Sequence, residues 1–196
     1  MSYTPQEYAQ KASEATAQNK KLFVIKGNLV IDDYDKYVNV RGKWVLNNKW
    51  KQEKSERIRK YLIENINKNN KNNVIYSYII VNISGEDIKI SIDKDARTNL
   101  NTQLSILSLQ DTSRIKWKCR LLSDDSPIVL DMSAFDYQSM MKSISKITHE
   151  VFELESKWND TLQELTEDQL LDNNYVDNII KQIQKDYKSV NTKVTL

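Results

Sequence analysis

Residues 133–165 have the sequence SAFDYQSMMKSISKITHEVFELESKWNDTLQEL, which contains no Gly and no Pro. Ser133, followed by Asp136 at the third helical position, is typical of a helix N-terminus. Apolar residues then recur at alternating four- and three-residue steps, with mainly polar residues between them. The stretch predicts one long, coiled-coil-like helix with an apolar stripe of Met140, Ile144, Ile147, Val151, Leu154, Trp158 and Leu165.

Two kinds of partner fit this apolar stripe. It can pack against the chain's own hairpins and helices, as amphipathic helices of globular proteins do. It can also pair with another chain, as coiled-coil helices do. A helix of about 32 residues is about 48 Å long, so part of it is expected to project from a domain of this size. Both interpretations stay open here, and the second makes residues 134–165 a candidate surface for homo-oligomerisation.

Alternating apolar and polar residues ahead of the long helix predict two β-hairpins. Their strands are expected at 74–83 with 88–92 and at 115–119 with 128–130. Helices are expected at 50–67 and 94–109, and the Asn-rich run 67–73 is expected to be a polar break. The predicted fold class is therefore α+β, with two β-hairpins packed by helices and a long C-terminal helix.

The first 48 residues predict a small module of a helix and a β-meander. Thr4, Pro5 and Glu7 mark the start of an Ala-rich helix with little apolar bulk. The short strands that follow carry Phe23, Tyr34, Tyr37 and Trp44, and so small a unit is not expected to bury all four rings. The module either docks on the rest of the chain or holds these rings open for a partner. We favour the second, which makes it an adaptor.

Three segments are therefore expected. Residues 1–48 form the adaptor, residues 49–165 form the α+β core that ends in the long helix, and residues 166–196 form a C-terminal helical segment and tail. The N-terminal residues lack the apolar core of a signal peptide, and no apolar run approaches the length of a membrane span.

The charge balance argues against a polyanion as the main partner. The chain has 29 basic and 27 acidic residues and a net charge of +2, which gives no strong field to attract nucleic acid or an anionic membrane. One short stretch, Lys116-Trp117-Lys118-Cys119-Arg120, combines basic residues with an aromatic ring. Period-two alternation places Trp117 with Ile115 and Cys119 on an inward face, so we expect the basic residues to be a solvated face.

Residues that carry chemistry are scarce. His149 is the single histidine and Cys119 the single cysteine, so a zinc site, a Cys–His pair or a disulfide is not expected. Three isolated glycines cannot build a phosphate-binding loop. The sequence therefore predicts no catalytic site, no cofactor and no metal, and the chain is expected not to be an enzyme.

The order of motifs between about Arg57 and Leu165 resembles a domain family of unknown function in tailed phages and prophages. A helix leads into the aromatic hairpin that begins at Val74, then comes Asp93 shortly before the pair Ala96-Arg97. A strand with Trp117 and the segment Ile128–Ser133 then lead into the long helix. Genes of this family often lie in tail or tail-fibre regions, and some are described as tail-fibre assembly proteins.

The resemblance implies a role in the phage tail. We expect a non-enzymatic structural or adaptor protein of the virion tail that is assembled in the host cytoplasm and contacts other tail or tail-fibre proteins. Two alternatives stay open: a tail-fibre assembly chaperone that is not retained in the virion, and a nucleic-acid-binding or regulatory accessory protein that uses the strand at 116–120.

Overall fold

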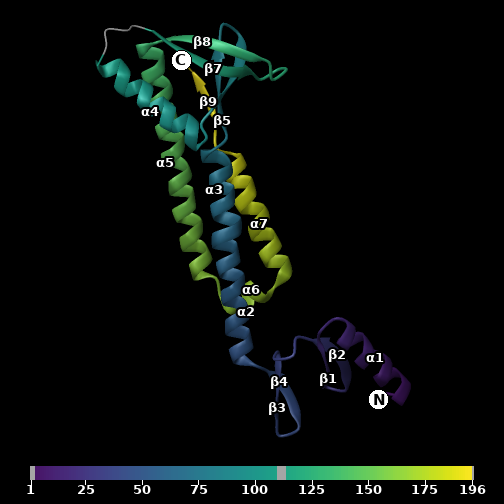
Figure 1. Cartoon of the computed structure of the whole chain (residues 1–196). Coiled ribbons are helices and arrows are strands. Elements are labelled where there is room, and N and C mark those ends of the chain that lie inside the picture. Colours follow the sequence, from purple (N-terminus) through teal and green to yellow (C-terminus); the bar gives the residue numbers. More distant parts are fainter. Residues whose placement is uncertain (1–2, 110–113, 196) are drawn as a thin grey trace. The chain divides into compact units, whose positions relative to one another are not determined.

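The computed structural model describes residues 3–109 and 114–195 and divides the chain into two compact units (Figure 1). The first unit consists of Met1–Arg59 with Thr166–Asn173, and the second of Lys60–Leu165 with Asn174–Leu196. Helices and β-hairpins occur in both units, so the predicted α+β class is confirmed.

The first unit begins with a capped helix and continues with two separate hairpins. Thr4 and Glu7 form a reciprocal capping box at the start of the first helix. The elements of the first unit are α1 (Pro5–Ala17), β1 (Lys21–Ile25), β2 (Asn28–Asp32), β3 (Tyr37–Val40), β4 (Lys43–Leu46), most of α2 (Asn48–Tyr61) and α6 (Glu167–Leu171). Strands β1 and β2 pair with each other, as do β3 and β4. Lys51 of α2 lies 2.8 Å from Asp168 and 3.6 Å from Glu167, which ties α6 to this unit.

The second unit contains one five-stranded sheet with the order β8-β7-β6-β5-β9. Its strands are β5 (Tyr78–Ile83), β6 (Glu86–Ser91), β7 (Arg114–Leu121), β8 (Pro127–Ser133) and β9 (Lys193–Thr195). All neighbours are antiparallel except β5 and β9. Both predicted hairpins are present, but the strand expected at 74–83 begins only at Tyr78, because Val74 and Ile75 are helical. Strands β5, β6 and β7 alternate more buried and more exposed side chains because one face of the sheet is covered.

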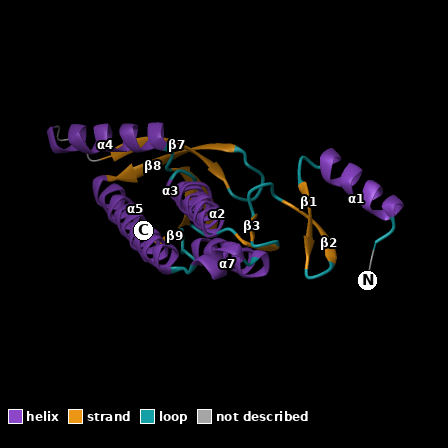
Figure 2. Ribbon diagram, turned by 90° about the horizontal axis from the view of Figure 1, so that it is seen from below, coloured by secondary structure: helices purple, strands orange, loops and turns teal. Residues whose placement is uncertain are grey.

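Helices cover the buried face of this sheet and extend beyond it as a bundle. They are η1 (Leu62–Asn67), α3 (Lys68–Ile75), α4 (Lys94–Leu109), α5 (Ala134–Glu164) and α7 (Asn173–Lys188). The start of α5 packs on β7, β8 and β9, and further along α5 packs on η1 and α3. Figure 2 looks along α5, α3 and α7 and shows the three helices grouped side by side.

The predicted polar break at 67–73 is wrong, because these residues are helical. Asn67 is fully buried in the π-helical turn η1, and its Nδ2 donates to the Glu155 carbonyl oxygen at 3.0 Å and to Asn159 Oδ1 at 2.9 Å. Its Oδ1 accepts from the Tyr187 hydroxyl at 2.7 Å. Asparagine is a weak helix former, but a satisfied buried network with α5 and α7 outweighs that preference.

The predicted division into 49–165 and a separate 166–196 segment is also wrong. Residues Asn174–Leu196 belong to the second unit, whereas Thr166–Asn173 belong to the first. Ile183, Tyr187 and Val190 are buried, and β9 pairs with β5 in place of the expected tail. Three residues are too few to show a strand periodicity, so this parallel pairing leaves no sequence signal.

Two buried tyrosines should make the second unit sensitive to alkaline pH. Burial raises the pKa of Tyr137 and of Tyr187 well above the ordinary tyrosine value. Above about pH 10 the unfolded chain releases these protons while the folded chain keeps them, so the free energy of unfolding falls as pH rises. Each tyrosine should contribute a slope of about 1.4 kcal/mol per pH unit, measured by urea unfolding across that range. Tyr187→Phe should remove one of the two contributions, and an unchanged slope would contradict its buried position.

Candidate interaction surfaces

The stripe of α5, predicted as a possible seam between chains, lies in the chain's own core. Six of its seven residues are buried within the second unit and only Leu154 is half-buried; the buried six are Met140, Ile144, Ile147, Val151, Trp158 and Leu165. They pack where α5 meets the sheet, η1 and α3. The interpretation as an intermolecular seam is therefore corrected: a heptad spacing only requires an apolar neighbour, and this chain supplies it.

The four aromatics of the predicted adaptor divide into a small core and one exposed ring. Phe23 is fully buried, and its ring centre lies 5.0 Å from that of Tyr37 and 5.1 Å from that of Trp44, both edge-on. Tyr37 and Trp44 are half-buried, whereas Tyr34 is 54% exposed. Phe23 is thus a core residue and not a contact for a partner, which corrects its prediction.

The opposite face of the β3–β4 hairpin is uncovered. The register places Val38 opposite Val45, and Val40 follows Val38 on the same face because side chains alternate along a strand. Val38 is 39% exposed, Val45 is 42% exposed and Val40 is 50% exposed. Trp44 and Tyr37 point to the other face, toward Phe23. The hairpin therefore presents three adjacent β-branched side chains to solvent, which we call the valine face.

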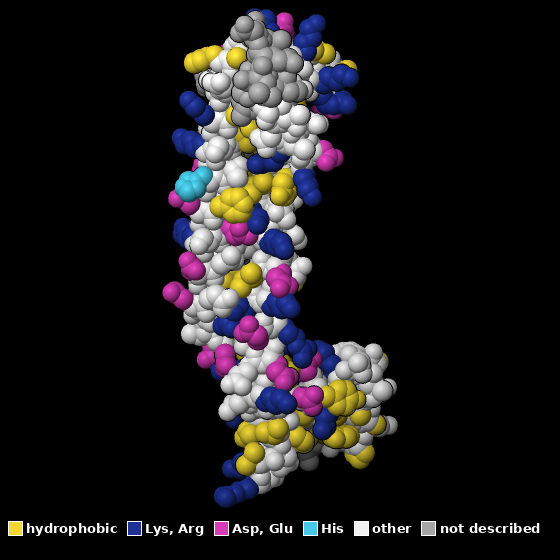
Figure 3. All heavy atoms as spheres, turned by 60° about the vertical axis from the view of Figure 1, so that its left-hand side comes forward, with side chains coloured by type: hydrophobic (Ala, Val, Ile, Leu, Met, Phe, Trp, Pro, Cys, Tyr) yellow, Lys and Arg dark blue, Asp and Glu magenta, His cyan; other side chains and the backbone are white. Residues whose placement is uncertain are grey.

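Exposed apolar residues concentrate in the first unit. Among the described residues, eight of the fourteen large hydrophobic residues that are exposed lie between Tyr3 and Leu46. Figure 3 shows hydrophobic side chains, in yellow, gathered on the surface of this unit. Adjacent exposed apolar residues, such as the three of the valine face, are typical of a protein-binding site. The sequence contains a signal for this face. Val38 and Val40 are two residues apart, which places them on the same face of a strand, and a turn at Arg41-Gly42 places Val45 opposite Val38.

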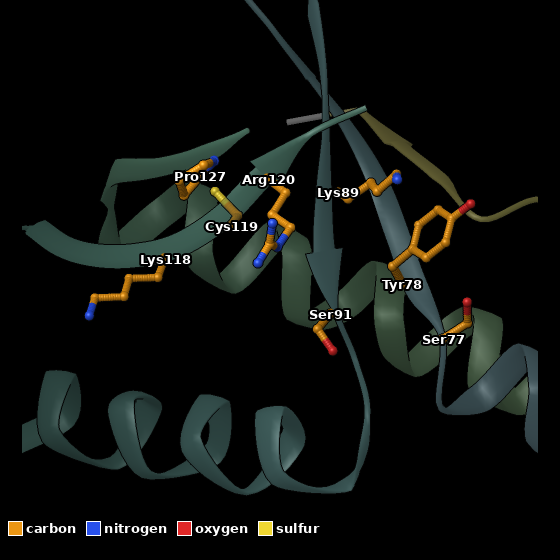
Figure 4. Close-up of a pocket in the computed structure, with 8 residues that line it drawn as sticks. All are labelled: Ser77, Tyr78, Lys89, Ser91, Lys118, Cys119, Arg120 and Pro127. Atoms are coloured by element: carbon orange, nitrogen blue, oxygen red, sulfur yellow. The ribbon is translucent and has the colours of Figure 1, made fainter. Parts of the chain in front are cut away.

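The basic strand predicted at 116–120 lies as its alternation suggested. Ile115 and Cys119 are buried, while Lys116, Lys118 and Arg120 are exposed. Trp117 is half-buried. Arg120 and Lys89 both pair with Asp125, at 3.3 and 3.2 Å. A gap beside this strand is lined by serine, lysine and arginine side chains together with Tyr78, Cys119 and Pro127 (Figure 4).

The residues with the most reactive side chains have ordinary surroundings. His149 is exposed on α5, and its Nε2 lies 3.2 Å from Glu153. Burial raises the pKa of the Cys119 thiol, which keeps it protonated and unreactive. Within residues 3–109 and 114–195, no group of three or more His, Cys, Asp or Glu side chains is placed to hold a metal ion. No helix in that part of the chain is long and apolar enough to cross a membrane.

Comparison of the chain with models of protein families, with curated proteins and with solved structures finds no match in any of these sets.

Proposed function

We propose that the protein is a non-enzymatic adaptor that joins other proteins through its first unit. Following the resemblance of residues 57–165, we place it in the tail of a bacteriophage, in contact with other tail or tail-fibre proteins. The second unit, with its sheet and helical bundle, is the rigid body of the adaptor. The first unit supplies the attachment surface, and the valine face is its centre.

The observation that carries the proposal is the uncovered valine face. A two-stranded hairpin is only marginally stable alone, and its inner side already contacts Phe23. Covering the outer side would add about 25 cal/mol for each Å² of apolar surface removed from water. Arg41 and Lys43 are exposed beside the valines. The matching partner therefore has an apolar centre with acidic residues around it.

Substituting the valine face should remove the protein from its particle. In a host infected by a phage that lacks the gene, a plasmid supplies the wild-type chain or Val38→Thr/Val40→Thr/Val45→Thr. Threonine keeps the β-branched shape and strand preference but places hydroxyls on the face. We expect mass spectrometry of purified particles to find the triple variant reduced by about tenfold or more, as loss of a central apolar contact requires.

Phe135→Thr/Phe152→Thr is the matched control, because it removes more apolar surface from exposed positions of the second unit. It should enter particles like the wild type, and thermal unfolding should show that both variants are folded. A folded triple variant that enters particles at the wild-type level would refute the role of the valine face.

A further inference from the structure

The two halves of the five-stranded sheet are joined by an unusually short ladder. Strand β7 pairs with β8 from Arg114 to Arg120, but with β6 only at Leu121 and Arg120, opposite Ile88 and Lys89. One further bond runs from the Leu122 amide to the Asp87 carbonyl oxygen at 2.8 Å. Beyond Arg120 the two strands separate, although β7 continues for six more residues to Arg114.

The backbone groups that border this gap can be assigned from the hydrogen bonds on either side. The Leu121 amide donates to Ser126 on the β8 side, and the Leu122 amide donates to Asp87 on the β6 side. Along an antiparallel strand, the backbone N–H and C=O groups of successive residues point alternately to one neighbouring strand and to the other. The backbone groups of Lys118 and Lys116 therefore point toward β6, as those of Leu122 do. Within the described residues, neither has a ladder partner there. They form a free strand edge inside a sheet.

The edge of β6 is open at the same place. The Ile92 amide donates to Ser77 on the β5 side, so the backbone of Ser91 faces β7. Ser91 and Lys118 would form the next rung after Lys89 and Arg120, and the ladder ends before it. Figure 4 shows Lys118 and Arg120 on β7 and Ser91 on β6, across the gap between the strands.

Two cavities meet at this missing rung. One has a volume of about 400 Å³ and the other of about 530 Å³, and Ser91 and Lys118 line both. Each volume lies within the range of ligand-binding pockets. The first cavity continues toward Tyr78 and Lys89, and the second continues along the start of α4 past Asn99. Together the two cavities border β7 from Lys116 to Arg120, which is the length of a short extended segment.

The charges at the gap favour an acidic ligand. In the described part of the chain, Lys116 and Lys118 are exposed and have no carboxylate partner, whereas Lys89 and Arg120 share Asp125. Two carboxylates line the second cavity on the α4 side, Asp93 and Asp95. Asp93 is already hydrogen-bonded: its Oδ1 accepts from the Ala96 amide at 2.8 Å and its Oδ2 from the Ser91 hydroxyl at 2.7 Å. The two lysines are spaced by two residues, the repeat of a strand.

We propose that the gap between β6 and β7 binds an extended acidic peptide segment of a partner protein as an added strand. The free backbone edge at Lys116 and Lys118 provides the main-chain hydrogen bonds, and the lysine side chains contact acidic residues at alternate positions of the peptide. This site lies in the second unit and does not depend on the valine face. A failure here would leave the proposed attachment through the first unit untouched, and the reverse also holds.

The test uses the full chain and a synthetic peptide of about six residues in which Glu alternates with Val, the pattern expected of an added strand. Fluorescence polarisation at physiological salt should show saturable binding. Lys116→Glu/Lys118→Glu should weaken it by about tenfold or more. The charge-matched control Lys142→Glu/Lys146→Glu, at exposed positions of α5, should leave the affinity unchanged.

Peptides methylated on alternate backbone nitrogens separate strand pairing from simple charge attraction. Only one of the two sets of N–H groups can point at β7, so one methylated register should bind at least about tenfold more weakly than the other. Equal affinities for the unmethylated peptide and both registers would overturn the proposal, as would an absence of saturable binding. A single-stranded oligothymidylate that displaces the peptide at physiological salt would overturn the peptide assignment in favour of nucleic acid.

Discussion

Val151→Asp is expected to prevent the second unit from folding. Val151 is fully buried where α5 packs on the rest of its unit. Placing an unpaired carboxylate there costs several kcal/mol, which approaches the total stability of about 5–15 kcal/mol of a typical domain. Circular dichroism and thermal unfolding should show loss of most of the helical signal. Phe152→Asp, the neighbouring residue on the exposed side of the same helix, should fold like the wild type.

The same pair of variants distinguishes intramolecular packing from pairing between chains. If the stripe of α5 joined two copies of the chain, Val151→Asp would give a folded monomer from a wild-type oligomer. Analytical ultracentrifugation of a folded Val151→Asp chain would reveal this outcome, and it would contradict the packing of α5 on η1 and α3.

Phe23→Ala is expected to unfold the first unit selectively. Among the described residues of the first unit, Phe23 is the one fully buried aromatic, and its ring makes edge-on contacts with Tyr37 and Trp44. Truncating a buried Phe costs about 3–5 kcal/mol, and a unit with so small a core has little more stability than that. Amide hydrogen exchange should show lost protection in β1 to β4 while the five-stranded sheet remains protected.

Tyr34→Ala is the control, because it removes an aromatic ring of the same unit that is exposed. It should leave protection in β1 to β4 unchanged. Loss of protection throughout both units in the Phe23→Ala variant would contradict their separate cores.

The local signals of the sequence predicted most of the elements. Capping boxes at Thr4 with Glu7 and at Ser133 with Asp136 fix the starts of α1 and α5, and both are formed. Gly27, Gly42 and Gly85 lie at hairpin turns with positive φ, a conformation that glycine adopts without steric cost. These features act over a few residues, so a sequence reveals them without knowledge of the tertiary structure.

The features that the sequence did not predict depend on contacts between residues that are far apart in the chain. Asn67 is helical because it bonds with Asn159 and Tyr187, which lie 92 and 120 residues away. Strand β9 exists because β5 offers it an edge. The stripe of α5 has the same spacing whether its partner is η1 of its own chain or a second chain, so periodicity alone could not decide.

The candidate surfaces were predicted only in part. The sequence predicts aromatic rings as the contacts of the adaptor, but Phe23 is buried and packs against Tyr37 and Trp44. The valines on the other face of the hairpin are the exposed residues. Two-residue alternation shows which side chains share a face, but not which face the rest of the unit covers. The gap beside Lys118 depends on where the ladder between β6 and β7 ends, and no local pattern encodes that point.

We propose that this chain is an adaptor built into a phage tail. Quantitative mass spectrometry of purified particles that contain the wild-type chain tests it most directly. We expect a fixed copy number in every preparation, in a constant ratio to the other tail proteins and resistant to salt washing. Absence of the chain from intact, infectious particles whose fibres nevertheless require its gene would contradict the claim and identify an assembly chaperone instead.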